Sequence, residues 1–158
     1  MNPTSRFIRP RSARRACRHA GFTLIETMIT VGIAGVLSSI AYPSLEGQVM
    51  RARRSDALVA LLQAQLAQER FRANNARYGT LADAGVGPIS PAGHYRIAIV
   101  SSDAAGFVLL ASAVAGQSRD TRCRHLRLAL ADATLTYASG SDATTANGAD
   151  ANRACWSR

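Results

Sequence analysis

The sequence has few of the side chains that enzymes use for catalysis. It contains three histidines, three cysteines and one tryptophan, and all 19 of its basic residues are arginines. The histidines His19, His94 and His125 are isolated from one another. Neither a nucleophile elbow, nor a phosphate-binding loop, nor a pair of catalytic carboxylates is recognisable. We therefore expect no enzyme activity and no cofactor.

Candidate metal ligands are equally scattered. Cys123 and Cys155 have no histidine at the spacing of a zinc site, which disfavours a metal centre built on them. Asp132, Asp142 and Asp150 do not match the spacing of a compact calcium loop, and we interpret them as turn residues. The sequence therefore predicts no bound metal.

A long apolar run extends from Phe22 to Tyr42, a length of 21 residues. As a helix it would span about 31 Å, close to the hydrocarbon thickness of a bilayer. One acid, Glu26, lies near its start. An acidic side chain costs roughly 2.5–3.5 kcal/mol at the middle of a membrane helix and less near its end. A carboxylate retained at this cost indicates a cationic partner.

Arginine is concentrated before this apolar run. Residues 1–21 contain six arginines and no acid, and their removal lowers the net charge from +9 to +3. These arginines are Arg6, Arg9, Arg11, Arg14, Arg15 and Arg18. Because basic residues hold their side of a membrane helix in the cytoplasm, we expect a cytoplasmic N-terminus and an exported remainder.

Residues 21–26, Gly-Phe-Thr-Leu-Ile-Glu, closely resemble the processing and assembly motif of the type IV pilin family, which includes the pseudopilins. The resemblance implies that a prepilin peptidase cuts after Gly21 and methylates the new N-terminus at Phe22. It also implies that Glu26 pairs with the N-terminal ammonium of a neighbouring subunit during assembly. Thr27 replaces the leucine more common in the family and leaves the cut site and the glutamate intact.

Two other interpretations of residues 1–42 remain. A secretory signal could end at Ala41, or the run could be a plain membrane anchor in which Glu26 is tolerated near the interface. The length of the run and the acid inside it favour the pilin interpretation over a cleaved signal.

Beyond the run, Pro43 is predicted to bend the helix, or alternatively to end it. Residues 44–74 are predicted to form an amphipathic helix with an apolar arc of about 100° facing the core. The residues of that arc are Leu58, Val59, Leu62, Leu66 and Ala73. Three arginines just outside the membrane, Arg51, Arg53 and Arg54, are expected either to touch lipid headgroups or neighbouring subunits, or simply to be solvated.

The second half of the chain favours strands. Residues 95–100, 106–114, 124–130 and 134–137 are predicted to form an antiparallel sheet that packs on the preceding helix. Residues 81–93 are predicted to connect the helix to the sheet, and residues 139–152 to form an exposed loop. The expected fold class is therefore α+β: a long hydrophobic helix whose second half packs on a small sheet.

Cleavage after Gly21 would remove Cys17 together with the leader, residues 1–21. Cys123 and Cys155 would remain outside the cytoplasm, where disulfides persist. A disulfide closing 31 intervening residues would stabilise the fold by about 3.5–4 kcal/mol. The pilin resemblance also implies a disulfide-bounded C-terminal segment, for which Cys-Trp at 155–156 is a common ending.

Arginines gather around both cysteines. A patch containing Arg122, Arg124 and Arg127, if the disulfide assembles it, would bind DNA phosphates, with Arg119, Arg153 and Arg158 nearby. The alternative is a solvated face whose charge is balanced by Asp120 and Asp132.

The resemblance is greatest to minor pilins of the PilE type. It implies a leader (1–21), a membrane or filament-core helix (22–43), a head helix (44–74) and a remainder (75–158) containing the sheet. We expect a structural minor pilin of a type IV pilus that serves pilus biogenesis, motility or adhesion. The alternatives are a DNA-binding minor pilin for natural transformation and a type II secretion pseudopilin.

The implied partners are other pilin subunits, the prepilin peptidase, the inner-membrane assembly platform and the membrane, with DNA as a further candidate. The implied location is the inner membrane, crossed once, before assembly and the extracellular pilus afterwards.

Overall fold

The computed structural model describes residues 21–157, apart from the side chains of Tyr42 and Pro43. The chain divides into two compact units, residues 1–39 and 40–158, which are considered separately. The leader arginines, Cys17 and His19 lie outside the described residues, as does Arg158.

The predicted long helix is confirmed as α1 (Leu24–Asn74). Its segment Leu24–Ala41 has a mean hydropathy of 1.8 and is fully exposed, so it is long and apolar enough to cross a membrane. The hydroxyls of Thr27, Thr30 and Ser39 each donate a hydrogen bond to a backbone carbonyl three residues earlier. These polar side chains are therefore satisfied inside the helix and add little to the cost of burial in lipid.

Helix α1 continues through position 43, so the alternative in which Pro43 ends the helix is wrong. Proline has no N–H group to donate to the carbonyl of Ser39 one turn earlier. The bend at Pro43 stays a prediction.

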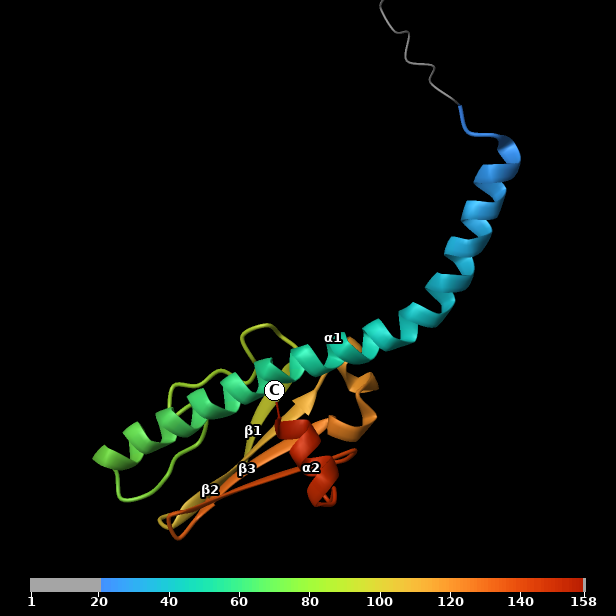
Figure 1. Ribbon diagram of the computed structural model, residues 1–158. Coiled ribbons are helices and arrows are strands. Elements are labelled where there is room, and N and C mark those ends of the chain that lie inside the picture. The colour runs from blue at the N-terminus through green and yellow to red at the C-terminus, as the bar shows by residue number, and fades with distance from the viewer. Residues whose placement is uncertain (1–20, 158) are drawn as a thin grey trace, which may run out of the picture. The chain divides into compact units, whose positions relative to one another are not determined.

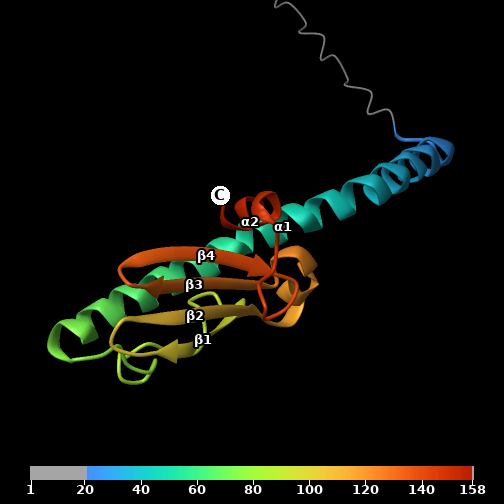
Figure 2. The ribbon, with the colours of Figure 1, turned by 90° about the horizontal axis from the view of Figure 1, so that it is seen from below.

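The predicted antiparallel sheet is confirmed in the second unit (Figures 1 and 2). Its spatial order is β1-β2-β3-β4, and each strand pairs with the next along the chain. The strands are β1 (Tyr95–Ser102), β2 (Gly106–Ala113), β3 (His125–Ala131) and β4 (Thr134–Gly140). Two short 3-10 helices, η1 (Ala115–Arg119) and η2 (Thr121–Cys123), join β2 to β3, and α2 (Ala149–Trp156) follows β4.

One face of the sheet packs on α1, but not on the predicted stripe. The buried residues of α1 are mainly Ala57, Ala60, Leu61 and Ala64, which join Ile97, Leu109 and Leu126 in the core. Of the predicted stripe, Val59, Leu62 and Leu66 are 42%, 51% and 52% exposed. Ala73 is exposed as well, and Leu58 only reaches the edge of the core.

The error has a packing cause. Alanines on the contact face let α1 approach the sheet closely, so the bulkier side chains are placed on the opposite face of the helix. Because most of the larger apolar residues of this part of α1 lie on its exposed face, the sequence pattern predicted the wrong face as the one that contacts the core.

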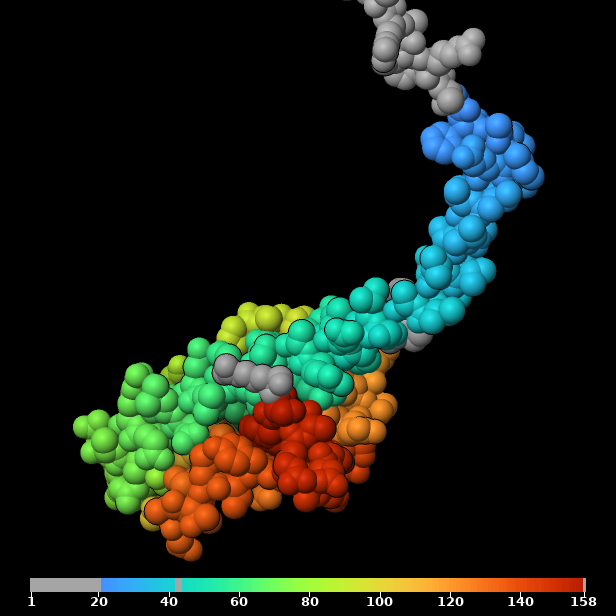
Figure 3. Space-filling model, viewed as in Figure 1, coloured from blue at the N-terminus to red at the C-terminus, as the bar shows by residue number. Residues whose placement is uncertain are grey.

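The exposed loop predicted for residues 139–152 is confirmed only in part: residues 141–148 form a loop that is mostly exposed, but both ends of the predicted range belong to regular elements. Strand β4 continues to Gly140, the Ser139 side chain is fully buried, and α2 begins at Ala149. The Ser139 hydroxyl donates a 2.8 Å hydrogen bond to Asn152 and accepts a 3.0 Å hydrogen bond from the side chain of Asn147. Polar residues that suggested a solvated loop are partners for one another. In Figure 3 this C-terminal segment fills the space between α1 and the end of the sheet.

The disulfide between Cys123 and Cys155 is present and joins η2 to the end of α2, with a Cα–Cα distance of 5.5 Å. Next to it, the indole N–H of Trp156 donates a 3.1 Å hydrogen bond to the carbonyl of Ala138, and its ring packs edge-on against Tyr137. The last helix is thus fixed to both the 3-10 segment and β4.

Asp56, on the buried side of α1, holds the loop that leads into the sheet. Its carboxylate accepts hydrogen bonds from the Ser90 hydroxyl at 2.5 Å, the Ala92 N–H at 2.9 Å and the His94 N–H at 3.1 Å. Burial alone would raise the pKa of Asp56, but these hydrogen bonds and the nearby His94 outweigh it and hold the pKa below its usual value.

Replacing Asp56 by Asn should destabilise the head by about 1–3 kcal/mol at pH 7, because an amide cannot accept all three hydrogen bonds. A lowered folded-state pKa gives stability that is present above the unfolded-state pKa and is lost as the pH falls through the folded-state pKa. The difference between Asp56→Asn and the unchanged protein should therefore shrink below about pH 4. Urea unfolding followed by Trp156 fluorescence in neutral detergent measures it, and a pH-independent difference would contradict this account.

Candidate functional site

The predicted processing site lies before the first helical turn. Gly21 and Phe22 are exposed and have no regular secondary structure, and the Phe22 side chain is 78% exposed. The helix starts with a hydrogen bond of 3.3 Å from the Glu26 N–H to the Thr23 hydroxyl, an N-cap contact. An accessible backbone without regular structure at Gly21 suits a peptidase, whereas the backbone of the helix that follows is held in hydrogen bonds.

The carboxylate of Glu26 is exposed within this apolar segment. Among residues 21–157 it takes part in none of the ion pairs, which involve Arg54, Arg119 and Arg153 instead. An acid at this position can therefore still accept a cation from another molecule.

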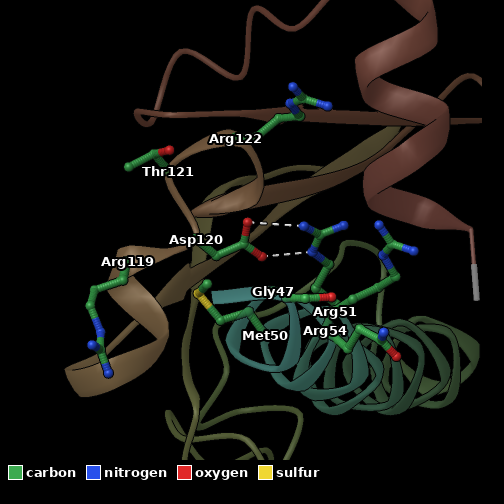
Figure 4. Close-up of a pocket in the computed structure, with 10 residues that line it drawn as sticks. Gly47, Met50, Arg51, Arg54, Arg119, Asp120, Thr121 and Arg122 are labelled. Carbon is green, nitrogen blue, oxygen red and sulfur yellow. Dashed lines mark hydrogen bonds and ion pairs between the residues drawn. The ribbon is translucent and has the colours of Figure 1, made fainter. Parts of the chain in front are cut away.

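A second candidate site lies entirely in the other unit, beside η1 and η2. It is a cavity of about 660 Å³ between the start of the head part of α1 and the 3-10 segment (Figure 4). Its lining residues are Ser44, Gly47, Gln48, Met50, Arg51, Arg54, Arg119, Asp120, Thr121 and Arg122. We call it the arginine groove.

A buried ion pair forms one wall of the arginine groove. Arg54 donates to Asp120 through Nε at 2.6 Å and Nη2 at 2.9 Å, a two-point contact visible in Figure 4. Its third nitrogen, Nη1, donates a 3.0 Å hydrogen bond to the carbonyl of Ala154 in α2. One side chain of α1 thus holds both the 3-10 segment and the C-terminal helix.

Gln117, in η1, also attaches the 3-10 segment to α1 and to β1. Its side-chain amide donates hydrogen bonds to the carbonyl of Met50, the hydroxyl of Tyr95 and the carboxylate of Asp120. Burial, with Asp120 nearby, raises the pKa of Tyr95 to about 12, so this phenol is neutral and keeps its proton.

The remaining arginines give the groove an excess of positive charge. Arg119 is paired with Glu46 at 2.7 Å, near the groove. Arg51 and Arg122 are exposed and, within the described part of the chain, belong to no ion pair. Two uncompensated guanidinium groups therefore line one cavity.

The outer face of the sheet is a separate basic surface. The four strands contain no acid, and their basic residues are Arg96, His125 and Arg127, which alternate with the buried residues of β1 and β3. His125 Nδ1 lies 3.0 Å from the Ser112 hydroxyl. Burial lowers the pKa of His125, and Arg124 lowers it further while Asp142 opposes them. The imidazole is thus neutral near pH 7, and the charge of this face comes from the two arginines.

The structure separates the three arginines predicted to contact DNA. Arg122 lines the arginine groove, whereas Arg127 lies on the outer face of the sheet. Arg124 directly follows η2 and donates a 2.9 Å hydrogen bond from Nε to the carbonyl of Ser118. Sequence reasoning left Arg96 out of this set, although its place in a strand that alternates buried and exposed residues was a usable signal.

In the part of the chain that the structure describes, no group of three or more His, Cys, Asp or Glu residues is placed to hold a metal ion. Asp142 accepts hydrogen bonds from Thr144, and Asp150 pairs with Arg153. Both acids therefore have local partners.

Comparison with known proteins connects these features to a family. Residues 43–127 match the family described as "Type IV minor pilin ComP, DNA uptake sequence receptor", and residues 17–42 match the prokaryotic N-terminal methylation motif. The chain is 36% identical over 63 residues to the type II secretion system core protein G of Klebsiella pneumoniae, covering 40% of this chain and 45% of the relative.

It is also 39% identical over 66 residues to the type IV major pilin protein PilA of Myxococcus xanthus (strain DK1622), covering 42% of this chain and 30% of that relative. The match thus spans less than half the length of either relative. The family match, in contrast, covers more than half of this chain and includes most of the head. The chain therefore belongs to the type IV pilin family, with the domain of the minor pilin ComP in its head.

Proposed function

We propose that this chain is a minor pilin, a structural subunit that is incorporated into a type IV pilus through its N-terminal helix. The observation that carries the proposal is a fully exposed apolar segment with a single acid, Glu26, near its start. Cleavage after Gly21 by the prepilin peptidase would create an ammonium group at Phe22. That cation, on a neighbouring subunit, is the partner that the Glu26 carboxylate needs in apolar surroundings.

Further support comes from the apolar side chains that the head leaves uncovered. Val59, Leu62 and Leu66 form an exposed face of α1 opposite the core, and Leu45 and Val49 are exposed nearer its start. Exposed apolar side chains that gather on one face, as Val59, Leu62 and Leu66 do, can mark a protein interface. Packing of α1 against the helices of other subunits would bury it and contribute about 25 cal/mol for each Å² removed from water.

Before assembly, the same segment would cross the inner membrane once, with the leader arginines in the cytoplasm and the head outside. There it would meet the peptidase and the assembly platform, and after assembly it would lie in the extracellular pilus. The ComP match over the head favours a pilus over a type II secretion pseudopilus, which remains the alternative suggested by the similarity to secretion protein G.

Replacing Glu26 by Gln should reduce the amount of this pilin in sheared filaments by at least about tenfold, since the neighbouring ammonium would lose a buried partner worth several kcal/mol. Processing and the membrane-bound amount should stay unchanged. Immunoblots of sheared and membrane fractions measure both. Glu69→Gln, the same change at an exposed position on the same helix, is the control, and normal incorporation of Glu26→Gln would contradict the proposal.

A second function is favoured by the two arginines on the outer face of the sheet, whose four strands contain no acid: we propose that the head binds DNA there. Arg96 and Arg127 supply the phosphate contacts, and Ser112 and His125 provide neutral hydrogen-bonding groups between their strands. Support comes from the description of the matched family as a DNA uptake sequence receptor. Binding of this kind is dominated by phosphate contacts and depends on salt.

The double variant Arg96→Gln, Arg127→Gln should weaken binding of duplex DNA by the full chain in neutral detergent by roughly tenfold at 0.1 M salt. The slope of log K against log salt should become shallower by up to about 2 units, one for each lost phosphate contact. Fluorescence anisotropy at several salt concentrations measures it. Arg70→Gln, an exposed arginine outside both basic surfaces, is the control. Equal affinities and slopes for both variants would exclude this surface.

A further inference from the structure

Neither proposed function uses the arginine groove, whose positive charge is uncompensated. Arg51 and Arg122 line it from two different elements, α1 and η2, and both are exposed. Within the described part of the chain, neither takes part in an ion pair. Arg54 adds little free charge, because it is committed to Asp120. The groove therefore offers two guanidinium groups to an anion from outside the head.

Asp132, in the turn between β3 and β4, is an acid that lacks a partner. Among residues 40–157, the other acids are each held by an ion pair or by a hydrogen bond. The carboxylate of Asp132 is exposed and, within these residues, makes neither. A surface acid is ordinarily hydrated, so the lack of a partner does not by itself make Asp132 a contact residue.

The turn that carries Asp132 is narrow. It consists of Asp132 and Ala133, between the paired residues Ala131 and Thr134. The φ angles of Asp132 and Ala133 are 47° and 63°, and positive φ at both residues is typical of the tightest hairpin connections. The turn is thus a thin tip with one charge. The groove is a hollow of about 660 Å³, within the range of about 300–1,000 Å³ that holds small ligands, so it has room for such a tip.

The neighbouring turn, between β1 and β2, adds a second acid. Gly106 pairs with Ala131, so the two turns lie side by side. Asp103 in this turn is exposed, but its Oδ1 already accepts two backbone N–H groups, at 2.7 and 2.8 Å. Arg77 is close along the backbone, since the N–H of Tyr78 donates a 2.9 Å hydrogen bond to the carbonyl of Asp103. Asp132 is therefore the acid of this end that is most open to a partner.

The tip and the groove lie at opposite ends of the sheet (Figure 2). Strand β3 begins just after η2, which lines the groove, and ends just before Asp132. Its seven residues span roughly 20 Å at 3.3 Å per residue, so Asp132 cannot reach the groove of its own chain. A contact between tip and groove must join two molecules. Because two different surfaces meet, the contact repeats from copy to copy, and such contacts build open helical filaments when they do not close into a ring.

We propose that the arginine groove of one copy receives the β3–β4 turn of a second copy of this chain, with the carboxylate of Asp132 between Arg51 and Arg122. The two oxygens of one carboxylate accept hydrogen bonds from both guanidinium groups. This inference rests on the proposed filament function and names the neighbouring subunit. Exposed ion pairs contribute little between free molecules. The contact therefore acts inside the filament, where the N-terminal helices hold the subunits at high effective concentration, and it sets the order of the heads.

Cross-linking in filaments tests the contact. Cells produce two differently tagged copies of the full chain, one with Gln48→Cys in the groove and the other with Ala133→Cys in the tip, both at exposed positions. A short bismaleimide joins the free thiols and leaves the disulfide intact. The mixed dimer in the sheared fraction should be at least about tenfold more abundant than with Thr136→Cys in place of Ala133→Cys. Thr136 is an exposed position in the middle of β4.

Charge reversal separates ion pairing from proximity alone. Arg51→Glu together with Arg122→Glu in the groove copy should lower the amount of mixed dimer by at least about tenfold, because like charges then face each other. Asp132→Arg in the tip copy should restore it. The matched control is Arg70→Glu together with Arg77→Glu in the groove copy, which makes the same change of charge at two exposed arginines outside the groove and should leave the yield unchanged.

Equal yields of mixed dimer with Ala133→Cys and Thr136→Cys would overturn the proposal. So would a charge reversal that has no effect or that Asp132→Arg does not rescue. Cross-links from Gln48→Cys only to a pilin of different sequence would assign the groove to other subunits instead. Absence of the chain from the sheared fraction would contradict incorporation and, with it, this contact, whereas a normal amount of chain without the mixed dimer would contradict the contact alone.

Discussion

The close packing of α1 on the sheet through small side chains is the constraint on which the head depends. Ala57, Ala60 and Ala64 let the helix lie near the strands, and Leu61 fills the contact. Because the contact face uses short side chains, the larger apolar ones are left on the opposite face, where they are exposed. The same arrangement thus builds the core of the head and leaves α1 with an exposed apolar face.

A second constraint is the buried pair of Arg54 and Asp120, which ties the 3-10 segment and α2 to that helix. Breaking a buried pair by removing one partner usually costs about 3–5 kcal/mol, because the other charge is left uncompensated. The disulfide of Cys123 acts on the same segment from the other side. The segment that carries Arg119 and Arg122 is therefore held by two independent attachments, which gives the arginine groove a fixed wall.

Much of the architecture could be predicted from the sequence, because its signals are local. The apolar run from Phe22, the alternation in the strands and the spacing of Cys123 and Cys155 each follow from a short stretch of residues. The core face of α1 could not be predicted from the sequence, because the choice between alanines and leucines depends on the distance between the helix and the sheet. The role of Ser139 was missed for a related reason: its partners, Asn147 and Asn152, have the composition of a solvated loop.

The candidate sites divide in the same way. The motif around Gly21 and Glu26 is contiguous and was found from the sequence. The two basic surfaces combine residues far apart in the chain, so the sequence placed Arg122 and Arg127 in one patch, and only the register of the strands and the contacts of η2 separate them. Arg51 lines the groove as a result of tertiary packing, which no local sequence pattern encodes.

The central claim is that the apolar segment is kept and joins a filament, and the N-terminus of the mature protein tests it most directly. Mass spectrometry of the protein from sheared filaments should find N-methylated Phe22 as the first residue. A first residue at Tyr42 would make the chain a secreted soluble domain, and an uncut chain starting at Met1 would make it an ordinary anchor. Either result would contradict the role assigned to Glu26.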